Sequence, residues 1–129
     1  METGVNPTVL LVEDEPIVQT VHRAILIKLG CKVDLAENGN QALNKFSNHY
    51  ALIFMDIGLP DMQGTEVTAE IRRNEHDDKP TPIVALTAYS EPELEEKCLR
   101  VGMNAVYRKP VTTSQFEEIL QRYLTDKVV

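Results

Sequence analysis

Residues 51–64 read ALIFMDIGLPDMQG, and this stretch decides the fold. Its first five residues are apolar without interruption, which is typical of a strand covered on both faces. Asp56 follows at once, and a polar turn leads to Gly64. Similar apolar runs occur at residues 9–12, 83–86 and, more weakly, 105–107. A buried strand that ends in a polar loop is therefore the repeating unit of the chain.

The stretches between these runs have the three- and four-residue spacing of apolar positions that indicates helices. Helices are expected from Pro16 to Gly30, after Asn38-Gly39, after Gly64, from Glu91-Pro92 to Gly102, and after Thr112. In the first helix the apolar stripe consists of Ile17, Val21, Ala24, Ile25 and Leu29. Residues 32–36 alternate between polar and apolar side chains, as an edge strand does.

Strand followed by helix, five times over, predicts an α/β fold with a doubly wound, five-stranded parallel sheet, (βα)5. No linker, repeat or low-complexity tract interrupts the pattern, and 129 residues suit one domain with one core.

Composition excludes several classes of protein. The formal net charge of −7 argues against direct binding to nucleic acid. No apolar run reaches the length of a membrane helix, and the first seven residues do not resemble a signal peptide, so we expect a cytoplasmic protein without membrane contact. Cys31 and Cys98 are expected to be buried free thiols, and His22, His49 and His76 to lie in solvent.

Polar residues follow four of the apolar runs directly. Glu13 and Asp14 follow the first, Asp56 the run at 51–55, Thr87 the run at 83–86, and Lys109 comes just after the last. Because the carboxyl ends of parallel strands meet at one edge, these side chains are expected to share one rim.

Crowded carboxylates repel each other, and a hard divalent cation relieves that repulsion. Mg²⁺ binds one or two carboxylates and leaves a position for a phosphate oxygen. The ammonium of Lys109 and the hydroxyl of Thr87 add the charge and the donor that stabilise a transferring phosphoryl group. The pattern therefore indicates phosphoryl transfer to a carboxylate.

Four strings carry a resemblance to a known family: LVEDE at 11–15, MDIGLPDMQG at 55–64, LTA at 86–88 and RKP at 108–110. In order and spacing they resemble the receiver domains of two-component response regulators. The resemblance covers residues 7–125 and leaves short tails at 1–6 and 126–129.

The resemblance implies a flavodoxin-like sheet in the strand order 2-1-3-4-5. It implies that Asp56 is the phosphoacceptor and that Glu13, Asp14, Asp56 and the carbonyl of Gly58 hold Mg²⁺ or Mn²⁺. Thr87 and Lys109 match the residues that grip the phosphoryl oxygens.

The same resemblance implies that Tyr107 is an aromatic switch, which turns into the space that Thr87 releases, and that the Lys109-Pro110 peptide is cis. Two positions depart from the usual pattern. Gly58 and Tyr89 flank the path of the water that would release the phosphate; glycine cannot orient that water and tyrosine can shield the site, so we expect a long-lived phosphorylated state.

Partners implied by the resemblance are a histidine kinase or a histidine phosphotransfer domain, with the chain a monomer or weak dimer. It would work either as a stand-alone regulator or as part of a hybrid histidine kinase, and residues 81–88 look more like the receivers of hybrid kinases. The isolated domain is not expected to be a turnover enzyme.

Two other functions compete with this reading. A phosphatase of the haloacid dehalogenase type would carry a second Asp where this chain has Gly58. A flavin-binding or scaffolding flavodoxin-like domain would carry a Ser-, Thr- and Gly-rich phosphate loop where residues 13–15 are acidic.

Overall fold

Strands and helices alternate along the whole chain. The structure is a computed structural model and describes residues 6–47, 49–75, 79–89 and 91–128. The elements are β1 (Thr8–Val12), α1 (Pro16–Lys28), β2 (Lys32–Ala36), α2 (Gly39–Lys45), β3 (Leu52–Asp56), α3 (Gly64–Asn74), β4 (Ile83–Thr87), α4 (Pro92–Arg100), β5 (Ala105–Arg108) and α5 (Thr113–Val128). The expected (βα)5 order is confirmed. Helix α5 continues past residue 125, where we expected a tail, and residues 1–5 and 129 lie outside the described residues.

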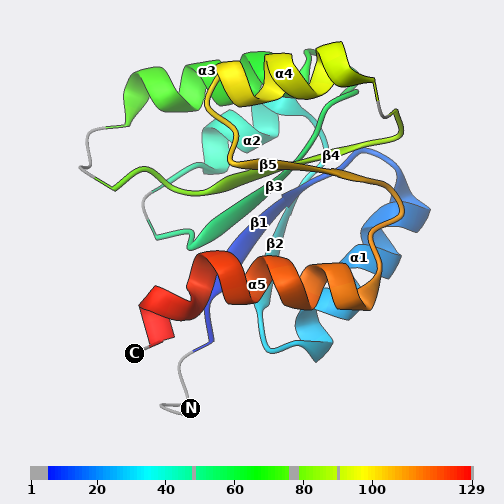
Figure 1. Cartoon of the computed structure of the whole chain (residues 1–129), viewed down its shortest axis with the longest axis vertical. Helices are drawn as coiled ribbons and strands as arrows, with labels where there is room; N and C mark the ends of the chain where they lie inside the picture. The colour runs from blue at the N-terminus through cyan, green and yellow to red at the C-terminus, as the bar shows by residue number, and fades with distance from the viewer. Residues whose placement is uncertain (1–5, 48, 76–78, 90, 129) are drawn as a thin grey trace.

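All neighbouring strands are parallel and form one sheet in the order β2-β1-β3-β4-β5 (Figure 1). This confirms the predicted order. Every residue of β3 and β4 is buried, whereas the edge strand β2 alternates between exposed and covered side chains. Burial on both faces explains why the inner strands have unbroken apolar sequences.

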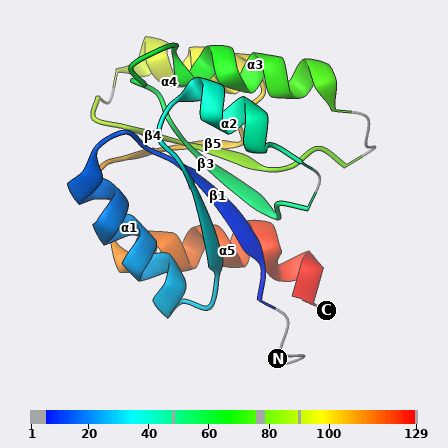
Figure 2. The same cartoon turned by 180° about the vertical axis from the view of Figure 1, so that it is seen from behind.

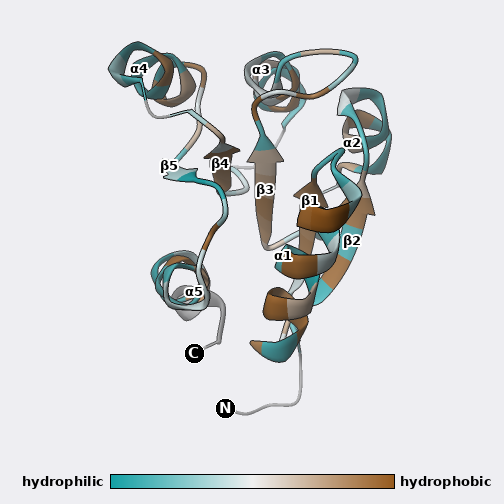
Figure 3. Ribbon diagram, turned by 90° about the vertical axis from the view of Figure 1, so that its right-hand side faces the viewer, coloured by the Kyte–Doolittle hydropathy of each residue, from teal (hydrophilic) through white to brown (hydrophobic). Residues whose placement is uncertain are grey.

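Helices cover both faces of the sheet. Figures 1 and 2 show α2, α3 and α4 on one face and α1 and α5 on the other, and Figure 3 shows the layers end-on. Two apolar clusters fill the spaces between the layers. The first contains Ile53, Val67 and Ile71; the second contains Phe54 and Phe116, whose ring centroids are 5.3 Å apart.

Helix ends follow their local sequence. Proline occupies the first turn of α1 and of α4, where its missing N–H costs no helical hydrogen bond. Gly30 and Gly102 follow the ends of these helices at φ of 101° and 113°, a conformation that glycine adopts without a steric penalty. None of the helices in the described ranges is long and apolar enough to cross a membrane.

Helix α1 packs differently from its sequence pattern. Its buried residues are His22 and Leu26, while Ile17 is 74% exposed and Val21 is 47% exposed. The expectation that His22 lies in solvent is therefore wrong. The sheet and α5 cover only a narrow strip of α1, and that strip is centred on His22 and Leu26 rather than on the whole apolar stripe.

The other small predictions concern histidines and cysteines. His49 is exposed, as expected, and His76 lies outside the described residues. Cys31 and Cys98 are buried and free, which is also confirmed.

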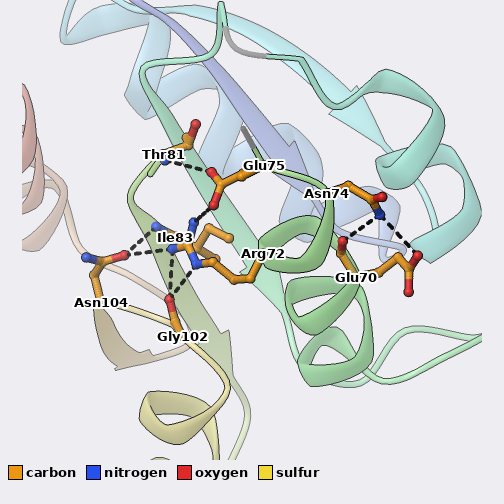
Figure 4. A network of polar contacts seen from close by, with 8 residues as sticks. All are labelled: Glu70, Arg72, Asn74, Glu75, Thr81, Ile83, Gly102 and Asn104. Carbon is orange, nitrogen blue, oxygen red and sulfur yellow. Dashed lines mark hydrogen bonds and ion pairs between the residues drawn. The ribbon is translucent and has the colours of Figure 1, made fainter. Parts of the chain in front are cut away.

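A polar network fixes the end of the sheet opposite the predicted site (Figure 4). Arg72 on α3 donates to the carbonyl of Gly102 from Nε at 3.0 Å and Nη2 at 2.8 Å, and pairs with Glu75 at 2.8 Å. Glu75 accepts from the amide of Thr81, and Asn104 accepts from the amide of Ile83. These contacts tie α3 to the starts of β4 and β5.

Candidate functional site

The carboxyl ends of four strands meet around one cleft. Glu13 and Asp14 follow β1, Asp56 ends β3, Thr87 ends β4 and Lys109 follows β5. All five line a cleft of about 720 Å³. The structure thus brings together the polar residues that the sequence places after its apolar runs.

The three acids form a compact group. Glu13, Asp14 and Asp56 each offer a carboxylate oxygen, and these oxygens lie within 4.8 Å of one another. Glu13 is fully buried and Asp56 is 3% exposed, whereas Asp14 is exposed. Three carboxylate oxygens this close together, one of them on an exposed residue, fit a hard divalent cation that completes its octahedron with water.

Lys109 neutralises part of this negative charge. Its Nζ lies 3.0 Å from Oε1 of Glu13 and 3.2 Å from Oδ2 of Asp56. Burial lowers the pKa of Lys109, but Asp56 and Glu13 outweigh it, so the net effect raises the pKa and the side chain stays charged.

Asp56 is an unusual carboxyl group. Burial and the charge of Glu13 raise its pKa to about 7, while Lys109 and the amide of Gly58 act in the opposite direction. That amide donates to Oδ1 at 3.2 Å. A cation beside the carboxylate favours its ionised form, so metal binding and ionisation of Asp56 support each other.

Thr87, Tyr89 and Pro110 also line the cleft. Thr87 is 3% exposed and its Oγ1 accepts from the amide of Tyr89 at 3.0 Å. The Lys109-Pro110 peptide is cis, as the resemblance implied. Tyr89 lines the cleft but is 66% exposed, so much of its side chain is in contact with solvent.

The side chain of Tyr107 lies on the opposite face of the sheet from the side chain of Thr87. Register pairs Leu86 with Tyr107 and Thr87 with Arg108, and side chains alternate between faces along a strand. Tyr107 packs against the cluster under α1 and α5, where burial and Glu118 raise its pKa.

The β5 residues that share a face with Thr87 are Val106 and Arg108. Together with Thr87 they line a second groove of about 210 Å³ beside the start of α4. A movement of Tyr107 into that space requires its side chain to cross the sheet, so the structure does not bring the expected switch residue to Thr87.

Sequence reasoning missed one glycine and one histidine. A Cβ on Gly64 would lie 2.2 Å from the carbonyl oxygen of Asp56, so this position supports the acceptor directly. His22 accepts a hydrogen bond from the amide of Val111, two residues after Lys109. The sequence offers a local signal for Gly64, which follows Asp56 by eight residues in the same motif, but nothing near His22 in sequence points to Val111.

Comparison with known proteins agrees with this geometry. The family model described as "Response regulator receiver domain" matches residues 9–121. The peroxide stress-activated histidine kinase mak3 of Schizosaccharomyces pombe is 35% identical over 128 residues, covering 95% of this chain and 6% of the relative. Transcription factor SKN7 of Chaetomium thermophilum is 38% identical over 123 residues, covering 92% of this chain and 16% of the relative. The chain thus spans a small part of the curated relatives it matches.

Solved structures share the whole fold. The receiver domain of sensor histidine kinase PA1611 from Pseudomonas aeruginosa PAO1, solved with a magnesium ion coordinated in the active site cleft, is 38% identical with a TM-score of 0.83. The match covers 94% of this chain and 99% of that one. A second match is the co-crystal structure of the Saccharomyces cerevisiae histidine phosphotransfer protein Ypd1 with the receiver domain of Ssk1. It is 30% identical with a TM-score of 0.86, and the match covers 96% of this chain and 92% of that one. With its acidic cleft, its sheet order and a family match across most of its length, the chain belongs to the response regulator receiver domains.

Proposed function

We propose that Asp56 accepts a phosphoryl group from a phosphohistidine on a partner protein, and that residues 7–125 are the receiver domain that carries it. The observation that supports this most strongly is the pairing of Asp56 with both a cation and two acids. Lys109 lies 3.2 Å from Asp56, and Glu13 and Asp14 complete the group. Such an arrangement stabilises charge on transferring phosphoryl oxygens.

The transfer exchanges one bond for another. A carboxylate oxygen of Asp56 bonds to phosphorus while the phosphorus–nitrogen bond breaks, and the imidazole leaves with that electron pair. Glu13, Asp14, Asp56 and the carbonyl of Gly58 would hold Mg²⁺ or Mn²⁺, which supplies positive charge for the phosphoryl oxygens.

Two further residues orient the phosphoryl group. The ammonium of Lys109 gives up its contact with Asp56 and binds a phosphoryl oxygen instead. Thr87 has a hydroxyl at the adjacent strand end, and its Oγ1 is held by the amide of Tyr89. When Thr87 donates to the phosphoryl group, that contact and the groove next to Val106 change, which alters the surface around α4 and β5.

We also propose the setting in which this reaction occurs. The chain receives the phosphoryl group from a histidine kinase or a histidine phosphotransfer domain in the cytoplasm, as a monomer or weak dimer. A place within a hybrid histidine kinase fits the likeness to mak3. The isolated domain catalyses only its own phosphorylation and dephosphorylation.

Intact mass after incubation with acetyl phosphate and Mg²⁺ tests the proposal. We expect a gain of one phosphoryl group, which is absent with a chelator and absent in Asp56→Asn. Asp61→Asn is the matched control, because the Asp61 carboxylate accepts from the amides of Gly39 and Asn40 rather than facing the cleft acids. An unmodified chain under these conditions, or equal loss in both variants, would reject the proposal.

A further inference from the structure

A buried histidine on α1 has no part in the chemistry described so far. His22 is fully buried, and its Nε2 accepts from the amide of Val111 at 3.2 Å. Its ring packs edge-on against Phe116 with centroids 5.2 Å apart. Since Nε2 is the acceptor, Nδ1 carries the proton, and Nδ1 has no hydrogen-bond partner among the described residues. Within the part of the chain that the structure describes, its one hydrogen bond is therefore the contact with Val111.

This contact anchors the loop that carries Lys109. Lys109 donates its own amide to the carbonyl of Thr87 at 2.8 Å, which fixes the loop where it leaves β5. Pro110 has no N–H to donate. The next amide is that of Val111, and His22 holds it. The Lys109 backbone is thus tied on one side by the sheet and on the other by His22.

The same helix also holds the acidic loop. Gln19 donates from Nε2 to the carbonyl of Glu13 at 2.5 Å. Gln19 and His22 are three residues apart, so they lie on the same face of α1. One rigid helix therefore contacts the backbone on both sides of the 3.0 Å pair between Lys109 Nζ and Glu13 Oε1.

We propose that His22 is a positioning residue for Lys109: its neutral imidazole fixes Val111 and so holds the ammonium at the distance from Asp56 that phosphoryl transfer needs. The inference rests on the function proposed above. Burial and the charge of Lys109 hold the pKa of His22 at about 4, which keeps Nε2 free to accept near neutral pH. Small displacements of a positioned group are costly in rate, even when the group itself is intact.

The test is the rate of phosphorylation by acetyl phosphate at saturating donor and Mg²⁺, followed by intact mass. His22→Leu keeps the volume but removes the acceptor, and we expect the rate to fall about tenfold. The Mg²⁺ concentration for half-maximal rate should stay within about twofold, because the carboxylates are unchanged. In a Lys109→Ala background the same substitution should change the residual rate by less than about twofold, because the group it positions is gone.

Rescue by a conservative variant separates positioning from packing. His22→Gln places an amide oxygen near the position of Nε2 and should recover most of the rate, whereas His22→Asn is one methylene shorter and should not. If His22→Leu does not fold, this pair carries the test. Tyr50→Phe is the matched control: it removes a hydrogen bond made by another buried side chain, from Tyr50 to Asp34 at 2.7 Å, and should leave the rate unchanged.

Each outcome decides the matter. Equal rates for the Gln and Asn variants, or an undiminished effect of His22→Leu in the Lys109→Ala background, would overturn the positioning role while leaving the proposed function intact. An unaltered chain that takes up no phosphoryl group would overturn the proposed function and this inference with it.

Discussion

Gly64 and Gly58 both lie near Asp56, but only Gly64 has no room for a side chain. A Cβ there would lie 2.2 Å from the Asp56 carbonyl oxygen, whereas a Cβ on Gly58 meets nothing within 4 Å. Gly64→Ala must therefore displace the backbone of the acceptor strand. We expect it to lower the free energy of unfolding by about 1–3 kcal/mol and to slow phosphorylation. Urea unfolding and the intact-mass assay measure the two effects, and Gly58→Ala, the control, should change stability by less than about 0.5 kcal/mol.

We expect the side chain at position 89 to influence how long a phosphoryl group on Asp56 persists. Tyr89 and Gly58 both line the cleft, and Gly58 has no side chain that could orient water. Tyr89→Glu supplies a carboxylate that can orient the attacking water, so we expect release of phosphate to become about tenfold faster, equivalent to about 1.4 kcal/mol of barrier. Loss of the phosphorylated mass after removal of the donor gives the rate. A variant that releases phosphate more slowly than the parent rejects this explanation.

Helix α1 exposes large apolar side chains near the cleft. Ile17 and Val21 face solvent, while Glu15 and Val18 of the same segment line the cleft. Because this segment borders the cleft, we expect a partner that brings a phosphohistidine to Asp56 to cover the first turns of α1. We therefore expect Ile17→Glu to slow transfer from a phosphorylated histidine phosphotransfer domain by about tenfold, because a buried charge is costly in an apolar contact.

Two comparisons identify the cause of that effect. Phosphorylation of Ile17→Glu by acetyl phosphate should be unchanged, because the small donor needs no docking surface. Leu99→Glu alters a residue that is 48% exposed on α4, on the opposite face of the sheet, and should transfer normally. Equal slowing by both substitutions would argue against docking at α1.

For the whole molecule, His22 couples stability to pH. Its pKa is about 4 in the folded chain and about 6.5 when exposed, so between these values the unfolded chain binds a proton that the folded chain does not. The free energy of unfolding therefore falls as the pH drops from 6.5 toward 4. This group contributes about 3 kcal/mol of that loss at pH 4. Urea unfolding of the parent and of His22→Gln at neutral and acidic pH measures it.

The glutamine variant has no proton to gain at this position. Its free energy of unfolding should fall less on acidification than that of the parent, by about the same 3 kcal/mol. Parallel losses in the two proteins would show that His22 does not carry this pH dependence.

The order of strands and helices and the rim of the cleft could be predicted from the sequence alone. Unbroken apolar runs mark strands that are covered on both faces, and parallel strands necessarily bring their carboxyl ends to one edge. For that reason Asp56, Thr87 and Lys109 could be placed together before any coordinates were known.

Only the tertiary structure decided which side chains face which neighbour. The side-chain direction of Tyr107 depends on the register between β4 and β5, and the burial of His22 depends on where α1 lies against α5. The spacing of apolar residues along a sequence determines whether each segment forms a helix or a strand. Contacts between these elements arise only when they pack together.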